Sequence, residues 1–546
     1  MRRTIRTTVG AATALLVLLG AAPAVAAAPP DAAGETVGGW RPGPIDWQPC
    51  PELPDDPAVR CATLTLPIDW ARPSGPTFSL AIAKRSATDP DARIGPLLVN
   101  PGGPGGSGVD DALDAERGLS PEILRRFDVI GFDPRGVARS NPIVCSLDLL
   151  AQQPHPAVAT ADEYGALLSF NRRVHDDCRA NTGPLFDHLD SVDVARDMDA
   201  VRAALGERKI STYGVSYGTL VGQMYAEQFP HRVRAMVLDS TMDHSLGARD
   251  FLRTETVGAQ ESFEQFAAWC DRTETCALHG QDVSEVFDRL TRRADAGELT
   301  EPDTDVALSW FDLSNMVVSA GYRPSWTMLA EWLAALDRTS GDPSAAGRTS
   351  SERAPAPRPV PAGTLGWPAA DPADRAAEPE LVQYPFPIFC DDWSMSIRDF
   401  DQYSRHLAEN RRLAPQVRAS ALGLFAVTAC LGWPGEVGNP QHRLAVRTEF
   451  PLLVLNSRYD PSTPYQWAVN VADQLGRHGR LVTYQGWGHG AYDRTPCTIA
   501  TVDRYLVDRK LPPVGATCAA AANPESAPPS RRSAERVPTL PTWSLN

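Results

Sequence analysis

A serine, an aspartate and a histidine occur in the order and local context of a catalytic triad. Ser216 lies in the pentapeptide Gly-Val-Ser-Tyr-Gly, Asp460 follows the apolar run PLLVLNSRY, and His489 follows LVTYQGWG. A serine hydroxyl attacks a carbonyl carbon only when a base takes its proton, and that base needs a carboxylate to fix its tautomer. The three residues therefore predict hydrolysis with Ser216 as nucleophile, His489 as base and Asp460 as acid.

Each of these residues also has a simpler explanation. Gly-x-Ser-x-Gly occurs by chance in glycine-rich turns, a histidine can bond at the surface, and Asp460 can cap the segment that begins at Pro461. Asp239, at the end of the apolar run MVLD, is an alternative acid, unless its carboxylate only fixes a loop. The triad is favoured because all three residues follow apolar runs in the chain order Ser, acid, His.

An oxyanion hole has candidates in a glycine-rich loop and in the residue after the nucleophile. One N–H group is expected from Tyr217, and the other from NPGGPGGSG (100–108), where Gly103 is favoured over Gly102. Glycines allow the backbone there to approach a substrate carbonyl and to adopt positive φ. A phosphate-binding loop is excluded because no Gly-Lys-Ser/Thr follows.

The elements that must position these residues are apolar strands that alternate with helical patterns. Residues 191–206 carry apolar side chains at helical spacing and end on a glycine. Strands that alternate with helices predict an α/β fold, in which a mostly parallel sheet has helices on both faces. The expected strands are 61–70, 77–85, 95–100, 127–132, 209–216, 233–241, 450–460 and 479–490, and a further helix is expected at 218–229.

The chain divides into five segments by composition. Residues 1–28 combine three arginines, an apolar run and Ala24-Val25-Ala26, the pattern of a signal peptide. We expect an exported protein, secreted to the exterior, with association with the cell wall as an alternative. The other segments are a first part of the α/β core at 29–243, a largely helical cap insertion at 244–445 with a mobile Pro/Ala-rich stretch at 339–379, a C-terminal part of the core at 446–518, and a disordered tail at 519–546.

The net charge limits the kinds of binding partner that are expected, and the cysteine content indicates the cellular compartment. A formal net charge of −15 argues against a nucleic-acid partner and against stable membrane association. An even number of cysteines in an exported chain predicts disulfides, and pairing in sequence order is expected, although the sequence does not fix it. Without Cys-x-x-Cys or a histidine cluster, no metal or other cofactor is expected. The cysteines are Cys50, Cys61, Cys145, Cys178, Cys270, Cys276, Cys390, Cys430, Cys497 and Cys518.

Several motifs together resemble the secreted tripeptidyl aminopeptidases, which are α/β-hydrolases related to the prolyl iminopeptidases. The motifs are NPGGPGGSG, GFDPRGVARS, DMDAVRAALG, ISTYGVSYGT, LVLNSRYDPSTP and GWGHG, and the resemblance extends over residues 45–518 except the Pro/Ala-rich stretch. It implies an α/β-hydrolase fold, removal of short peptides from free N-termini, and a cap that blocks internal cleavage. Pro101 replaces the histidine usual in the iminopeptidases, which argues against specificity for a single proline.

The resemblance also assigns site residues, and it agrees with the residues chosen above. It implies a triad of Ser216, Asp460 and His489, and an oxyanion hole formed by the Gly102-Gly103 turn and Tyr217. In GFDPRG, Asp133 and Arg135 are expected to pair and to shape the neighbouring loop.

The predicted activity is that of a secreted serine exopeptidase that releases tripeptides or similar short peptides. A substrate with a free N-terminus carries an ammonium group, for which Asp391 and Asp392 in FCDDW are candidate ligands. These acids alternatively cap a helix that begins near Trp393. The alternative activity is that of an esterase or amidase for small hydrophobic substrates, because the same triad serves esters and amides. The oligomeric state is not predicted.

Overall fold

The computed structural model describes residues 37–302, 304, 306–338 and 380–526. The predicted signal peptide, the Pro/Ala-rich stretch and residues 527–546 lie outside the described residues. Residues 519–526, predicted as the start of a disordered tail, pack on the fold instead. There the Ala521 N–H donates to the Tyr484 hydroxyl at 3.2 Å, and Glu525 accepts the Thr327 N–H at 2.7 Å. Within the described ranges, no helix is long and apolar enough to cross a bilayer.

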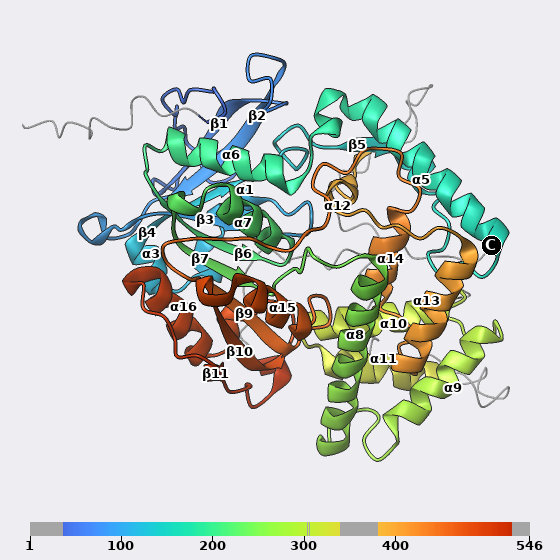
Figure 1. Cartoon of the computed structure of the whole chain (residues 1–546). Coiled ribbons are helices and arrows are strands. Elements are labelled where there is room, and N and C mark those ends of the chain that lie inside the picture. Colours follow the sequence, from blue (N-terminus) through green and yellow to red (C-terminus); the bar gives the residue numbers. More distant parts are fainter. Residues whose placement is uncertain (1–36, 303, 305, 339–379, 527–546) are drawn as a thin grey trace, which may run out of the picture.

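A nine-stranded sheet forms the centre of the described part of the chain, in the order β1-β2-β4-β3-β6-β7-β9-β10-β11 (Figure 1). Strand β2 is antiparallel to both of its neighbours, and all other neighbours are parallel. The predicted strands are all present, and the mostly parallel sheet is confirmed. The strands are β1 (Val59–Pro67), β2 (Thr77–Arg85), β3 (Gly95–Asn100), β4 (Phe127–Phe132), β6 (Ile210–Val215), β7 (Val233–Asp239), β9 (Leu452–Tyr459), β10 (Gly479–Trp487) and β11 (Thr517–Cys518).

Helices cover both faces of the sheet, because successive side chains of a strand point to opposite sides. Leu98 of β3 belongs to the core beneath one set of helices, and its neighbour Leu97 belongs to the core beneath the other. One face carries α6 (Ser191–Ala204), α7 (Tyr217–Gln228) and α15 (Tyr465–Leu475). The other carries α1 (Gly108–Leu113), α2 (Ala115–Gly118), α3 (Pro121–Arg126) and α16 (Pro496–Asp508).

The segment between β7 and β9 is largely helical, as the sequence predicts (Figure 1), and part of it has a hydrophobic core of its own. We call residues 244–445 the insertion. Its helix α9 begins after Asp282, whose carboxylate accepts the N–H groups of Ser284 and Glu285. The helices are α8 (Ala248–Arg272), α9 (Val283–Asp295), α10 (Trp310–Tyr322), α11 (Trp326–Arg338), α12 (Pro387–Asp392), α13 (Phe400–Leu413) and α14 (Ala421–Ala429).

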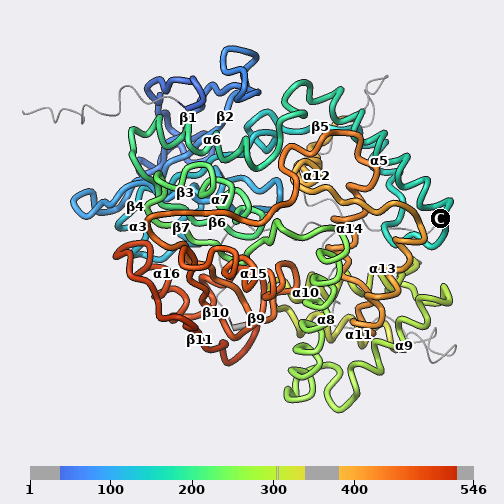
Figure 2. The backbone as a smooth tube through the Cα atoms, in the orientation of Figure 1, coloured from blue at the N-terminus to red at the C-terminus, as the bar shows by residue number. Residues whose placement is uncertain are grey.

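Elements from before β6 join the insertion, which the sequence does not predict. Strand β5 (Val144–Ser146) pairs with β8 (Leu381–Gln383) of the insertion, and the short helix α4 (Leu147–Leu150) follows it. Helix α5 (Ala161–Thr182) packs beside α13 and α14, and its Asn171 amide donates to the carbonyls of Thr428 and Leu431 at 2.8 Å. The backbone trace in Figure 2 follows this segment from the sheet into the helical region.

Disulfides join the ten cysteines in sequence order, which confirms the expected pairing. Cys145 and Cys178 tie β5 to α5, and the adjacent Asp177 completes a group that resembles a metal site; the disulfide, however, occupies both sulfurs. Cys390–Cys430 ties α12 to the end of α14 within the insertion. The other pairs are Cys50–Cys61, Cys270–Cys276 and Cys497–Cys518.

Candidate active site

Ser216 occupies the sharp turn between β6 and α7, as its motif predicts. Its φ of +56° and ψ of −125° are rare for a residue with a side chain, so the surroundings must hold this conformation. The Ser216 N–H donates to the Asp239 carbonyl at 3.0 Å, and the Ser216 carbonyl accepts the Thr219 hydroxyl at 2.6 Å. These bonds hold the strand-to-turn-to-helix geometry of a nucleophile elbow.

The two glycines of the motif are required by close backbone contacts. A Cβ atom on Gly214 would lie 2.5 Å from the Gly218 carbonyl oxygen, within the turn itself. A Cβ atom on Gly218 would lie 2.4 Å from the Asn100 carbonyl oxygen, at the end of the neighbouring strand β3. Helix α7 therefore begins in direct contact with β3, at the carboxyl edge of the sheet.

Asp460 and His489 form a buried carboxylate–imidazole pair. His489 Nδ1 lies 3.0 Å and 3.1 Å from the two carboxylate oxygens of Asp460, and each residue is 1% exposed. Asp460 follows β9 and His489 follows β10, so adjacent parallel strands deliver both residues to one edge. The contact assigns the Nδ1 proton to the side of Asp460 and directs Nε2 away from it.

Further donors keep Asp460 ionised. Its carboxylate accepts the N–H groups of Ser462 and Thr463, both at 2.9 Å, and the Thr463 hydroxyl at 3.0 Å. Burial by itself raises the pKa of Asp460, but His489 and these N–H groups outweigh it and hold the pKa below its usual 3.8. The carboxylate is therefore charged at neutral pH and able to stabilise an imidazolium.

Ser240, which the sequence analysis does not single out, connects the acid to the histidine loop. Its hydroxyl donates to Asp460 at 2.8 Å and accepts the Gly490 N–H at 2.7 Å. Ser240 has a φ of +56° and lies just beyond β7. The only signal in the sequence is its place directly after an apolar strand, next to Asp239.

Asp239, the alternative acid, fixes the loop after the histidine. Its carboxylate accepts the N–H groups of Ala491 at 2.8 Å and Tyr492 at 3.0 Å, and the Tyr213 hydroxyl at 2.8 Å. Its carbonyl accepts the Ser216 N–H. The structure thus favours the loop-fixing explanation for Asp239 and pairs His489 with Asp460.

The glycine-rich loop packs directly on the elbow. A Cβ atom on Gly102 would lie 2.4 Å from the Val215 carbonyl oxygen and 2.9 Å from the Tyr217 nitrogen. The Gly102 N–H donates to the Asn100 side chain at 3.0 Å. Because this N–H is engaged, Gly103, with a φ of +110°, stays the favoured candidate for an oxyanion donor beside Tyr217.

Asp392 contacts the elbow through the Tyr217 side chain. The Tyr217 hydroxyl donates to this carboxylate, which also accepts the Ser191 hydroxyl at 2.7 Å and the Asn439 amide at 2.8 Å. Burial raises the pKa of Asp392 to about 6, although these hydrogen bonds lower it. The carboxylate is fully buried, and these contacts join α12 of the insertion to the start of α7.

Asp391 and Asp392 do not cap a helix at Trp393, because α12 ends at Asp392. That alternative explanation is wrong. The Asp391 carboxylate accepts the Leu189 N–H at 3.4 Å, and burial, together with Asp190 and Asp392, raises its pKa well above 3.8. The binding of a substrate ammonium group by this pair stays a prediction.

The insertion also contacts His489, the candidate base. Tyr322, the last residue of α10, accepts the His489 N–H on its carbonyl at 2.7 Å. The Tyr322 and His489 rings lie with centroids 4.4 Å apart. The insertion therefore contacts both His489 and Tyr217, the residue that follows Ser216.

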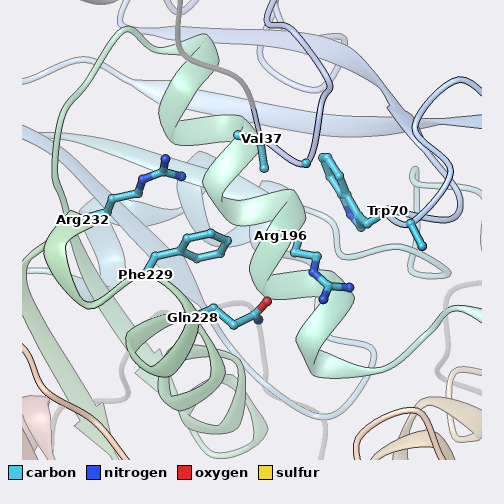
Figure 3. A pocket seen from close by; sticks show the side chains of 8 residues that line it. Val37, Trp70, Arg196, Gln228, Phe229 and Arg232 are labelled. Carbon is cyan, nitrogen blue, oxygen red and sulfur yellow. The ribbon is translucent and has the colours of Figure 1, made fainter.

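A pocket of about 490 Å³ lies apart from these residues (Figure 3). Two arginines point into it from α6 and from the turn before β7, but each also pairs with an acid, Arg196 with Asp193 and Arg232 with Asp199. It contains none of the triad or oxyanion candidates. Its lining residues are Val37, Gly38, Trp70, Ala71, Arg196, Gln228, Phe229 and Arg232.

Comparison with known proteins agrees with this geometry. The family model described as alpha/beta hydrolase fold matches residues 95–496. The serine protease Hip1 of Mycobacterium tuberculosis is 31% identical over 497 residues, 87% of this chain and 91% of that protein. Carboxylesterase B of the same species is 32% identical over 542 residues, which cover 92% of this chain and 95% of that protein. The tripeptidyl aminopeptidase of Streptomyces lividans is 29% identical over 501 residues, which cover 88% of this chain and 87% of that protein.

Proposed function

We propose that this chain, which belongs to the α/β-hydrolase fold family, is a serine exopeptidase that releases tripeptides or similar short peptides from free N-termini. The observation that carries the proposal is the buried Asp460–His489 pair at the same sheet edge as the elbow of Ser216. Two similar proteins over most of the chain, Hip1 and the Streptomyces enzyme, are a serine protease and a tripeptidyl aminopeptidase.

In the proposed reaction, Ser216 Oγ bonds to the scissile carbonyl carbon while its proton passes to His489 Nε2. The N–H groups of Tyr217 and Gly103 stabilise the negative oxygen of the tetrahedral intermediate. The C–N bond then breaks, His489 returns the proton to the departing amine, and the short peptide remains as an ester on Ser216. Asp460 stabilises the imidazolium throughout.

A water molecule completes the cycle. His489 takes a proton from the water as its oxygen attacks the ester carbonyl, and the intermediate collapses to a free peptide carboxylate and the Ser216 hydroxyl. This chemistry uses only groups of the protein, the substrate and water. A charged Asp460 at neutral pH suits both halves of the cycle.

Selection for a free N-terminus requires a group that binds an ammonium ion. Asp391 and Asp392 are the proposed ligands, and both lie in the insertion at the end of α12, close to Tyr217. If Asp391→Ala and Asp392→Ala leave KM for a free-amine tripeptide substrate unchanged, this assignment is wrong.

We also propose that the protein acts outside the cytoplasm, either secreted or at the cell wall. Five disulfides among the described residues support this, since such bonds persist in oxidising compartments. The expected signal peptide provides the route of export.

A second candidate function is esterase or amidase activity on small hydrophobic substrates. Its support is the similarity to Carboxylesterase B over 92% of this chain. A tripeptidyl anilide with a free amine, the same anilide after N-acetylation, and a simple p-nitrophenyl ester separate the two. An exopeptidase cleaves the free-amine anilide and not the acetylated one, whereas an esterase prefers the ester to both anilides and ignores the acetyl group.

Ser216→Ala is the control for every substrate, and it should abolish each activity. Mass spectrometry of a digested model peptide then gives the length of the released fragments. Fragments of three residues from the N-terminus support the proposal. Internal cleavage, or full activity of Ser216→Ala, contradicts it.

A further inference from the structure

The Arg494 guanidinium binds the backbone carbonyls of His489 and of the next residue, Gly490. Arg494 Nη2 donates to the His489 carbonyl at 2.7 Å, and Nε donates to the Gly490 carbonyl at 2.7 Å. Nη2 also reaches the Tyr322 carbonyl at 3.5 Å, at the end of α10. Arg494 is 7% exposed, so these bonds lie in a largely water-free environment.

The same loop is anchored at each backbone N–H from residue 488 to residue 492. Four different residues hold these groups: one in β9, one in α10, the last residue of β7 and the residue directly after it. In order, Gly488 donates to the Tyr459 carbonyl, His489 to the Tyr322 carbonyl, Gly490 to the Ser240 hydroxyl, and Ala491 and Tyr492 to the Asp239 carboxylate. Arg494 in addition binds the carbonyls of His489 and Gly490, so that both N–H and C=O groups of this loop are held by hydrogen bonds.

Burying the Arg494 guanidinium at this place costs free energy of folding, so its presence calls for an explanation. Among the residues that the structure describes, no carboxylate forms an ion pair with Arg494, and a buried charge held only by carbonyl dipoles is an expensive anchor. The planar fork of arginine is suited to several acceptors at once, which the single ammonium of lysine is not. Gly488 leaves room for it, because a Cβ atom there would lie 2.7 Å from Arg494 Nη2.

We propose that Arg494 is a positioning residue for the catalytic base, and that through Tyr322 it makes the end of α10 a fixed support of His489. The insertion then contributes to the catalytic geometry itself, in addition to any part in selecting substrates. The proposal rests on the proposed function only in taking His489 as the base. It holds equally for peptide and ester substrates.

The imidazole provides the readout that separates positioning from folding. It faces Asp460 and Thr463 from the loop after β9 and the Tyr322 ring from α10, and Arg494 is the cation bonded to its backbone. Loss of a nearby cation favours the imidazolium. The acid limb of the profile of kcat/KM against pH should therefore move to higher pH without Arg494.

The test compares Arg494→Met and Arg494→Lys with Arg504→Met, a change at an exposed arginine of α16 whose Nε bonds only the Ala500 carbonyl within its own helix. Rates are taken per active site, by titration with a phosphonate that reacts with Ser216. A tripeptidyl anilide and a p-nitrophenyl ester are both used. For Arg494→Met we expect kcat to fall about 10²-fold on each substrate with KM within about twofold, since small displacements of a catalytic group have effects of this size.

Arg494→Lys should recover part of the loss, and Arg504→Met should match the wild type. A lower melting temperature with wild-type kcat per active site and an unmoved pH profile would overturn the proposal, because it would reveal a merely structural arginine. Should Arg494→Met fail to fold, wild-type kcat and pH profile in Arg494→Lys would overturn it equally. If the wild-type enzyme cleaves only the ester, the peptidase proposal is wrong. The role of Arg494 can then still be tested with the ester as substrate.

Discussion

The Ser240 hydroxyl donates to the Asp460 carboxylate at 2.8 Å, although the two residues are 220 positions apart in the chain. The same hydroxyl accepts the Gly490 N–H at 2.7 Å. One side chain therefore fixes Asp460 relative to the loop that carries His489. This contact adds a fourth donor to the Ser462 N–H, the Thr463 N–H and the Thr463 hydroxyl, which also bond the Asp460 carboxylate.

Ser240→Ala should reduce both catalysis and stability. The change leaves the Gly490 N–H without its acceptor and removes one donor from Asp460, a loss of about 1–3 kcal/mol for a buried unpaired group. We expect kcat to fall about tenfold with little change in KM, because the base loses its alignment. Steady-state kinetics with an ester or anilide substrate measures this.

Ser245→Ala is the matched control, since its hydroxyl bonds Asp243 in the same loop and not the triad. It should have wild-type kcat. Equal activity of Ser240→Ala and Ser245→Ala would show that the contact to Asp460 has no catalytic consequence.

The identity of the acid can be tested by two matched substitutions. Asp460→Asn places an amide against His489 Nδ1 and favours the wrong tautomer, so kcat should fall about 10³- to 10⁴-fold. Asp239→Asn disturbs the N–H groups of Ala491 and Tyr492, so it should lower the free energy of unfolding by about 1–3 kcal/mol and kcat by no more than about tenfold. Thermal unfolding and kinetics on both variants decide between the two acids. A larger loss of kcat in Asp239→Asn would reverse the assignment.

Much of the sheet, and the placement of Ser216, Asp460 and His489 at one edge of it, could be predicted because both leave local marks in the sequence. Apolar runs such as GPLLVN and PLLVLN become central strands buried on both faces, a pattern that needs no knowledge of the partner strands. Ser216, Asp460 and His489 each follow such a run, and parallel strands bring their carboxyl ends to one edge.

The contacts that were not predicted join residues far apart in the sequence. Asp133 and Arg135 were expected to pair with each other, and this prediction is wrong. Arg135 bonds Asp197 of α6 at 2.7 Å, whereas Asp133 accepts the Ser107 hydroxyl at 2.5 Å. Side chains two positions apart in a loop can contact different elements, and only the folded structure shows which element each one contacts. Tyr322, which supports His489 from within the insertion, was missed for the same reason.

The buried carboxyl group of Asp392 should make stability depend on pH in a definite direction. Its pKa rises to about 6 in the folded protein from about 3.8 in the unfolded chain. Between these values the unfolded chain ionises while the folded protein stays protonated, so stability falls as pH rises from about 4 to about 6. The size of this term is about 3 kcal/mol at 1.36 kcal/mol per pKa unit.

Asp392→Asn removes this dependence. Because Asp190 and Asp391 also titrate nearby with raised pKa values, the useful quantity is the difference between variant and wild type in the free energy of unfolding. Denaturant unfolding at pH 4, 5, 6 and 7 should show this difference moving in favour of the variant up to about pH 6 and then levelling off. A difference that stays constant with pH would mean that Asp392 is ionised throughout.

The elbow glycine gives the sharpest test of the local geometry. In Gly218→Ala the new Cβ atom would lie 2.4 Å from the carbonyl oxygen and 2.8 Å from the side-chain oxygen of Asn100, so α7 must move away from β3. That movement displaces the Tyr217 N–H and Ser216 together. We expect kcat to fall at least about 10²-fold and the free energy of unfolding to fall by about 1–3 kcal/mol.

Gly165→Ala serves as the control because a Cβ atom there would meet nothing within 4 Å, on the exposed side of α5. Alanine is the better helix former, so this variant should be more stable by up to about 1 kcal/mol with wild-type kcat. Kinetics and thermal unfolding on the pair separate a general effect of adding a methyl group from the specific contact at Asn100. Wild-type kcat in Gly218→Ala would show that the start of α7 can shift without displacing the nucleophile.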